Sequence, residues 1–521
     1  MIKHIFLFIF SVFFSATASS QAYFNHRFEY GQPGWWDGAT NIYQAPDGYV
    51  FGGGMMYYED YMRLSFYKVD FEENCIFSKN YYDTADFYIG NPGSIINLSS
   101  DTLIVVGTKH VHTSNWVHDQ GLLYFLNNSF DTLFTKYFGE KTEPFDSSFS
   151  FRQVKLDSDT NIIIVGTIWP QPVWRHLLLI KTDRHGNKKW GKIYDNYKHN
   201  EGHSVICTND GGYAIGGFMW ETLPAPNLSG DPVVLKTDSI GNQQWYHMFG
   251  SPFIDSKGML CNTMDGNMVL GFAYCDSMFG GGPHTEGSPY RRINLIKLDN
   301  SGNIVWDKKY GESEYEKHLL NIRENPDGTL VSTGITTQFF PYAYKYVGWI
   351  LKTDADGETI WYRQYDICHG ESSWNYLYDV IQTNDKGYIA CGVVYPRPPD
   401  TGSQDGWVIK VDSLGCEDPS YCWVGMRPET EMPAGPGIKL FPNPADKHTT
   451  LTGMNAPPGE PLTIRFIDVF GWEVKTVDVP QVLHDFELNV SQMAEGMYVV
   501  LIESQSRIIG KTKLIIRRGN F

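Results

Sequence analysis

Short apolar runs separated by turn residues dominate the hydrophobic pattern of this chain. One unit consists of Ser204–Thr208, Tyr213–Gly217, Val233–Asp238 and Gln243–Gly250, with Asn-Asp-Gly-Gly and Gly-Asn among the intervening turns. Short apolar runs bounded by Asp-Gly and Gly-Asn are typical of strands joined by tight turns. The pattern therefore predicts four antiparallel strands in each unit and no helix of any length.

A motif recurs at constant spacing within these units. It consists of Lys-x-Asp, a Gly three residues after the Asp and a Trp seven residues after it, and it spans Lys181–Trp190, Lys236–Trp245, Lys297–Trp306 and Lys352–Trp361. In the first two units Phe77 and Phe134 stand at the Trp position, and in the second unit Asn127 replaces the Asp. Such repetition indicates a repeat architecture, in which the large ring packs against the neighbouring unit.

A glycine in the second strand marks each unit. These glycines are Gly53, Gly107, Gly166, Gly217, Gly271, Gly334 and Gly392. Seven four-stranded units predict an all-β fold, a seven-bladed β-propeller over residues 21–423. The last unit has no fourth strand after Cys416, whereas Phe24–Tyr30 resembles the other fourth strands. We therefore expect this N-terminal segment to complete the last blade.

The composition changes after Trp423. Residues 424–437 form a linker rich in Pro, Gly and acidic residues. Residues 438–521 contain short strands with period-2 alternation, which predicts a small immunoglobulin-like β-sandwich.

The N-terminus has the parts of a secretory signal. Lys3 precedes the apolar stretch Ile5–Phe14, and Ala16-Thr17-Ala18 provides small residues for cleavage, so we expect residues 1–20 to be a signal peptide. The alternative, a membrane anchor, requires about 20 apolar residues, and no segment of the mature chain is expected to span a membrane.

Four elements of the tail stand in a characteristic order. They are Pro442-Asn443-Pro444, the turn from Asp468 to Gly471, Gly496-x-Tyr498 and the terminal strand that begins near Lys511. The tail resembles the type A C-terminal sorting domain of type IX secretion cargo from Bacteroidetes. The resemblance implies recognition by the type IX translocon and a secreted or cell-surface location reached through the periplasm. The alternative is an ordinary immunoglobulin-like appendage.

The blade motif is similar to the repeat of quinoprotein dehydrogenases and their non-enzymatic relatives. Its spacing departs from the tighter Asp-x-Gly-x-x-Trp box of sialidases. Quinone enzymes of that type commonly carry a vicinal Cys-Cys pair, which this chain lacks. We therefore expect the motif to build turns and blade contacts, and we expect no cofactor.

Charge and cysteine content narrow the classes of partner. The formal net charge of −17 disfavours nucleic acid, because binding to phosphates gains affinity from Lys and Arg. The eight cysteines are too few for a disulfide scaffold, although a Cys416–Cys422 bridge is plausible in an exported chain. No Cys/His cluster has metal-ligand spacing, so no metal site is expected.

Aromatic residues are concentrated in the loops expected on one face. The candidate ligand-binding residues are Tyr57, Tyr58, Trp116, Trp169, Trp220, Tyr290, Arg291, Tyr342 and Trp374. Aromatic faces stack on sugar rings or peptide side chains, and polar neighbours orient them. Such rings can equally pack beneath their own loops.

Catalytic signals are weaker. Glu312, Glu314 and Glu316 could supply a carboxylate pair, but no nucleophile elbow, zinc motif or phosphate loop occurs. The catalytic residues are therefore unknown. We expect a surface protein that binds an extracellular glycan or protein. The alternatives are a glycan hydrolase or lyase with a site at the channel mouth, and a non-catalytic scaffold.

Overall fold

The apolar runs fold into antiparallel hairpins in the computed structural model. The structure describes residues 23–28, 36–56, 63–72, 74–81, 86–112, 117–139, 147–170, 174–196, 199–222, 228–279, 288–311, 316–340, 343–417, 439–452, 462–467, 473–479, 486–504 and 507–518. Within these residues the chain is all-β, without a helix, as the pattern predicted. No helix of the described residues has the length and apolarity needed to cross a membrane.

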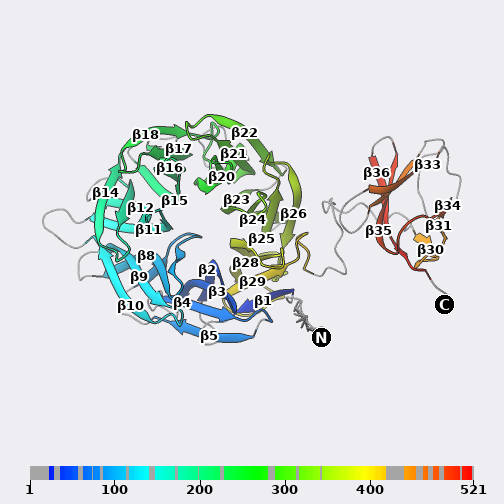
Figure 1. Ribbon diagram of the computed structural model, residues 1–521, viewed down its shortest axis with the longest axis horizontal. Coiled ribbons are helices and arrows are strands. Elements are labelled where there is room, and N and C mark those ends of the chain that lie inside the picture. Colours follow the sequence, from blue (N-terminus) through cyan, green and yellow to red (C-terminus); the bar gives the residue numbers. More distant parts are fainter. Residues whose placement is uncertain are drawn as a thin grey trace, which may run out of the picture. The chain divides into compact units, whose positions relative to one another are not determined.

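Six sheets, called the ring below, follow one another around a circle (Figure 1). Their inner-to-outer strand order mostly follows the sequence, since each strand pairs with the next one along the chain. The first three sheets contain β2 (Trp36–Ala45), β3 (Gly48–Met56), β4 (Arg63–Val69) and β5 (Cys75–Asn80); β6 (Asp86–Ile89), β7 (Ile95–Ser99), β8 (Thr102–His112), β9 (Val117–Asn127) and β10 (Thr132–Phe138); and β11 (Ser147–Leu156), β12 (Ile162–Pro170), β13 (His176–Thr182) and β14 (Lys188–Tyr194). The next two contain β15 (His199–Cys207), β16 (Tyr213–Thr222), β17 (Leu228–Thr237) and β18 (Gln243–Met248); and β19 (Met259–Asn262), β20 (Met268–Phe279), β21 (Ser288–Leu298) and β22 (Ile304–Tyr310).

The sixth sheet combines two four-stranded groups. One group is β23 (Lys317–Glu324), β24 (Leu330–Phe340), β25 (Ala343–Thr353) and β26 (Thr359–Tyr365); the other is β27 (Trp374–Gln382), β28 (Tyr388–Tyr395), β29 (Asp405–Val411) and β1 (Phe24–Phe28). A single parallel bridge between Tyr346 and Trp374 links the two groups.

Strand β1 comes from the other end of the chain and pairs antiparallel with β29, from Phe24 opposite Lys410 to Phe28 opposite Gly406. Phe24 and Phe28 are buried in a hydrophobic cluster shared with the first sheet. The guanidinium of Arg27 donates to the buried carboxylate of Asp405 (Nε to Oδ2, 2.8 Å). Apolar packing and an ion pair therefore both hold this strand in place.

The repeated Asp and Gly of the motif form the turn between third and fourth strands. Asp238 Oδ1 accepts hydrogen bonds from the backbone nitrogens of Ile240 (3.0 Å) and Asn242 (2.8 Å). Gly241 has φ +80°, and a Cβ added there would lie 3.0 Å from the ring of Trp190 in the preceding sheet. The same carboxylate-capped turn occurs at Asp183, Asp299 and Asp354. The motif thus builds turns and contacts between sheets.

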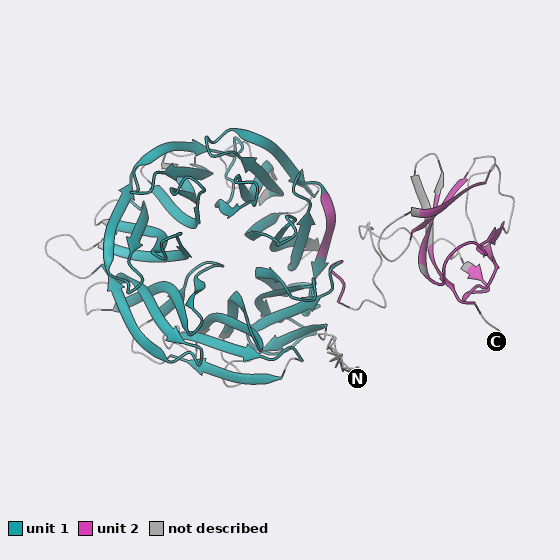
Figure 2. Ribbon diagram, in the orientation of Figure 1, with its two compact units in different colours: residues 1–358, 364–413 teal, residues 359–363, 414–521 magenta. Residues whose placement is uncertain are grey.

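The tail folds into two sheets around one core. The first contains β30 (Lys439–Phe441), β31 (His448–Thr452) and β34 (Phe486–Asn489), and the second contains β33 (Glu473–Val479), β32 (Leu462–Ile467), β35 (Gly496–Ser504) and β36 (Arg507–Ile516). Leu451 and Leu488 of the first sheet share this core with Ile464 and Ile502 of the second. The chain divides into two compact units, residues 1–358 with 364–413 and residues 359–363 with 414–521 (Figure 2).

Six cysteines are free among the described residues, and Cys391 is fully buried. Cys416 is disulfide-bonded, whereas Cys422, its predicted partner, lies outside the described residues.

Candidate functional site

The described aromatic candidates lie at the ends of strands and not in the loops where the sequence analysis put them. Trp169 is in β12, Trp220 in β16 and Trp374 in β27, while Tyr290 and Arg291 are in β21. The hairpin strands continue beyond the apolar runs because backbone pairing extends into polar sequence; Trp220, for example, pairs with both His199 and Gly230. Four candidates, Tyr57, Tyr58, Trp116 and Tyr342, lie outside the described residues.

Trp374 belongs to a cluster of aromatic rings where the two groups of the sixth sheet meet. Its ring lies 6.0 Å from that of Tyr376, nearly parallel at 13°, and 4.9 Å from that of Tyr395. Tyr346 contacts Trp374 edge to face at 5.7 Å, and Tyr344, which is 48% exposed, contacts Tyr346 at 5.5 Å. These residues form a partly exposed aromatic surface, called the Trp374 cluster below.

Trp169 and Trp220 lie on adjacent sheets, the third and the fourth, and each ring contacts different side chains. The Arg175 guanidinium lies 4.9 Å above the Trp169 ring, and the His199 ring meets Trp220 edge to face at 5.9 Å. Arg175 also pairs with Glu201 on β15, the strand that carries His199. A chain of polar contacts through Arg175, Glu201 and β15 therefore links Trp169 to Trp220. Neither residue belongs to the Trp374 cluster.

Arg291 connects β21 to two segments that precede inner strands, one of them the inner strand of the next sheet. Its Nη1 donates to Glu316 Oε1 (2.8 Å), and its Nη2 donates to the backbone oxygen of Ile254 (3.1 Å). Tyr290 is half-buried. Glu316 is thus committed to Arg291 and His318, while Glu312 and Glu314 lie outside the described residues.

A group of ionisable residues that the sequence analysis did not single out as a group is built around Glu201 and His203 on β15. The Oε2 of Glu201 lies 3.3 Å from Nε2 of His203, and Arg175 binds the other oxygen. Burial lowers the pKa of His203 to about 4, with the charges of Lys257 and Arg152 acting in the same direction against the hydrogen bond to Glu201. His203 is therefore neutral at physiological pH.

The charges around this pair stabilise the Glu201 carboxylate. Burial alone would raise the pKa of Glu201, but hydrogen bonds and charges from His203 and Arg175 outweigh it and lower the pKa to about 2. Burial and the charge of Arg152 lower the pKa of Lys257 to about 8. A neutral imidazole, a carboxylate and two basic groups thus converge on one place.

The loop 90–94 interrupts the inner strand of the second sheet. In five of the other four-stranded groups this strand has a single bulge opposite the second-strand glycine, for example between Gly202 and Ser204. Here β6 and β7 are separated by Gly-Asn-Pro-Gly-Ser. Asn91 Nδ2 donates to the backbone oxygen of His203 (3.0 Å) and lies 3.2 Å from its Nδ1, while Gln153 Nε2 donates to Pro92 O (2.8 Å). The loop therefore bridges inner strands of the second, third and fourth sheets.

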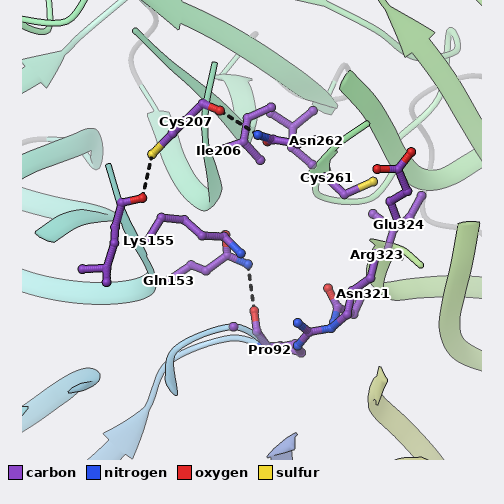
Figure 3. Close-up of a pocket in the computed structure, with 14 residues that line it drawn as sticks. Pro92, Gln153, Lys155, Ile206, Cys207, Cys261, Asn262, Asn321, Arg323 and Glu324 are labelled. Atoms are coloured by element: carbon purple, nitrogen blue, oxygen red, sulfur yellow. Dashed lines mark hydrogen bonds between the residues drawn. The ribbon is translucent and has the colours of Figure 1, made fainter. Parts of the chain in front are cut away.

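A cavity of about 330 Å³ lies against this loop. Its walls come from the loop and from the last residues of β11, β15, β19 and β23, where the inner strands enter the turns to the second strands. Figure 3 shows Lys155 and Arg323 entering it from opposite walls, with Glu324 on the same wall as Arg323. No group of three or more His, Cys, Asp or Glu residues suited to a metal ion occurs in the part of the chain that the structure describes.

The predicted sorting residues connect the first and last strands of the tail. Asn443 Nδ2 donates to Lys513 O (2.6 Å), and its Oδ1 accepts from Ile515 N (2.8 Å). Thr449 Oγ1 donates to Pro442 O (2.9 Å), and Pro444 precedes the bridge from Ala445 to Ile516.

The second half of the sorting motif lies on β35 and β36. Gly496 has φ +152°, and Tyr498 is buried with its hydroxyl donating to Ala494 O (2.8 Å). Lys511 stands on β36 opposite Leu501. Asp468 and Gly471 lie outside the described residues.

This tail is the part of the chain that matches a known family. Residues 439–517 match the secretion system C-terminal sorting domain. The match supports the interpretation of the chain as type IX secretion cargo, and it indicates export to the cell surface or the extracellular space.

Several solved structures are similar to this chain at low sequence identity. An α-L-arabinanase of Penicillium chrysogenum complexed with arabinobiose is 11% identical, with a TM-score of 0.37, over 61% of this chain and 92% of that one. The polysaccharide lyase Uly1 is 8% identical, with a TM-score of 0.42, over 72% and 90%. A protein of unknown function from Dyadobacter fermentans is 12% identical, with a TM-score of 0.34, over 57% and 88%. No curated protein matches the chain.

Proposed function

We propose that the ring is a seven-bladed β-propeller whose last blade takes its outer strand from the N-terminus. The four-stranded groups and the pairing of β1 with β29 support this count, with the sixth sheet contributing two blades. In this proposal residues 1–20 are a signal peptide, 21–423 the propeller, 424–437 a linker, and 438–521 an immunoglobulin-like sorting module. The similarity of the blade motif to quinoprotein repeats concerns blade construction and no cofactor.

The propeller binds an extracellular glycan in this proposal, and the Trp374 cluster carries it. Trp374 and Tyr376 present nearly parallel rings, and the adjacent Tyr344 is substantially exposed. Flat aromatic faces stack on the apolar faces of sugar rings, and phenol hydroxyls bond the sugar hydroxyls at the edge. A polymer in the medium or on another cell suits the exported location.

The second candidate function is enzymatic, a glycan hydrolase or lyase. The observation that favours it is the convergence of Glu201, His203 and Lys257 with perturbed pKa values, because catalytic acids and bases are commonly tuned in this way. A non-catalytic scaffold for other surface proteins is the third candidate.

A glycan array probed with the mature chain separates these functions. We expect specific binding that falls about tenfold or more in Trp374→Ala, by analogy with the stacking of a nucleobase on an aromatic ring, which contributes about 1–3 kcal/mol. Tyr137→Ala is the matched control, because Tyr137 is a 41% exposed ring on the outer strand β10.

Chromatography of the bound glycans after incubation tests turnover. Unchanged glycans support the binding proposal, whereas cleavage that disappears in His203→Gln supports the enzyme. A blank array with no cleavage contradicts both and leaves the scaffold. Equal binding by Trp374→Ala and wild type overturns the assignment of the site.

A further inference from the structure

The lysines of the repeated motif all stand on third strands, and most have a carboxylate partner. The pairs, each 2.7 or 2.8 Å apart, are Lys68–Asp47, Lys181–Asp157, Lys236–Asp210, Lys297–Asp265 and, in the last group, Lys410–Asp385. These pairs satisfy cations that are largely removed from water.

Lys155 does not belong to this motif. It lies on the inner strand β11, and within the described residues its ammonium group has no hydrogen-bond or ion-pair partner. Burial and the charge of Arg323 across the cavity lower the pKa of Lys155. A half-buried cation without a partner is unfavourable, and a chain with 59 acidic residues has many carboxylates that could have paired with it.

Arg323 does not supply a second free charge. Its Nη2 donates to both carboxylate oxygens of the buried Asp379, at 2.8 and 2.9 Å. Asn321 Nδ2 donates to the same carboxylate at 2.6 Å. This ion pair fixes one wall of the cavity, and Lys155 remains as the cation available to a ligand.

The remaining walls suit a ligand with both polar and apolar faces. The carboxamide of Asn262 and the carboxylate of Glu324 supply polar groups, and Ile206 and Leu260 supply apolar surface. The volume of about 330 Å³ falls at the lower end of the range for small-molecule sites, about 300–1,000 Å³. A single sugar or small hydroxy acid is therefore the expected size.

We propose that this cavity binds a small carboxylate that also carries hydroxyl groups, such as a uronic acid, with Lys155 holding the carboxylate. Asn262 and Glu324 bond the hydroxyl groups opposite. The site is separate from the Trp374 cluster: the cavity is walled by the last residues of inner strands, such as Cys207 and Glu324, whereas Trp374 is the first residue of its inner strand.

Calorimetric titration of the mature full-length chain tests the proposal with D-glucuronate as the probe and D-glucose as its neutral counterpart. We expect glucuronate to bind and glucose to bind at least about tenfold more weakly, because a hydrogen bond to a charged group contributes about 1.5–3 kcal/mol. Lys155→Met should weaken glucuronate binding by a similar factor. Lys188→Met, at an exposed position on the outer strand β14, should leave it unchanged.

Absence of glucuronate binding, equal binding of glucose, or equal binding by Lys155→Met overturns the proposal. Trp374→Ala should retain glucuronate binding. The glucuronate test and the glycan-array test of the Trp374 cluster can therefore fail independently.

A labelling experiment on the wild-type chain tests the role of Lys155 even if the Lys155→Met variant does not fold. Amine-specific labelling followed by mass spectrometry should modify both Lys155 and Lys188, and glucuronate should protect Lys155 alone. Equal labelling of Lys155 with and without glucuronate contradicts the proposal.

Discussion

The second-strand glycines are the residues on which the blade geometry depends most strictly. At Gly53, Gly107, Gly166, Gly217, Gly334 and Gly392 an added Cβ would lie between 1.5 and 2.3 Å from a backbone oxygen of the first strand. In five of these four-stranded groups the first strand bulges at this point, which brings its carbonyl toward the glycine. The regular occurrence of glycine in the sequence thus has a steric cause.

Gly392→Ala should therefore destabilise the ring strongly. Its Cβ would lie 1.6 Å from the oxygen of Tyr376, and the backbone must move to accept it, at a cost of about 3 kcal/mol or more. Gly328→Ala is the control, because no atom lies within 4 Å of its added Cβ and only its φ of +80° opposes the change, at about 1–2 kcal/mol. Urea denaturation that gives equal losses for both variants would contradict this explanation.

His203 should make the stability of the ring depend on pH. The unfolded chain takes up a proton near pH 6.5, whereas the folded chain does so only near pH 4. Because the unfolded state then binds more protons, the free energy of unfolding should fall as the pH falls through this window, by at most about 1.4 kcal/mol per pH unit.

His203→Gln should remove this part of the slope, as measured by denaturation at a series of pH values. His247→Gln, at an exposed position on β18, should retain it. Identical slopes in the wild type and His203→Gln would refute the role of His203.

The sequence pattern did not reveal the ionisable group around Glu201 and His203. Glu201 and His203 alternate on a strand that reads as an ordinary inner strand, and Lys257 precedes the next inner strand. Their convergence depends on the placement of two neighbouring sheets, which no local spacing encodes. By contrast, Asn91-Pro92-Gly93 is a strong turn signal, and it could have indicated the loop that contacts His203.

At the scale of elements, periodicity predicted strands, turns and their antiparallel order well. Turn chemistry is local, since Asp238 caps its own turn and Gly241 provides the positive φ. The split of the inner strand into β6 and β7 was not predicted, because the sequence analysis assigned a single inner strand to each unit. The extension of strands through Trp169 and Trp220 was also missed, because polar sequence can still pair.

Strand β1 should contribute to stability through its two buried phenylalanines. Phe24→Ala with Phe28→Ala should lower the melting temperature by about 10 °C or more, because removing a buried Phe side chain costs about 3–5 kcal/mol. His26→Ala, at the exposed position between them, should have little effect. If the double variant melts like the His26 variant, the strand does not hold the ring together.

At the scale of the whole molecule, the tail matches a sorting domain, whereas the ring carries the proposed binding function. The tail packs its own core, and Asn443 connects its first strand to its last. Its function was predictable because a sorting signal is a sequence-local motif that a receptor recognises. The proposed glycan site was not predictable, because aromatic rings from the two groups of the sixth sheet form the Trp374 cluster only after folding.

Cell fractionation tests most directly the central claim that the tail directs export of the chain. The producing cells should express the full chain and a chain that ends at residue 437. We expect the full chain at the cell surface or in the medium and the shortened chain folded in the periplasm, because only residues 439–517 match the sorting domain. Appearance of the shortened chain outside the cell, in amounts similar to the full chain, would contradict the account.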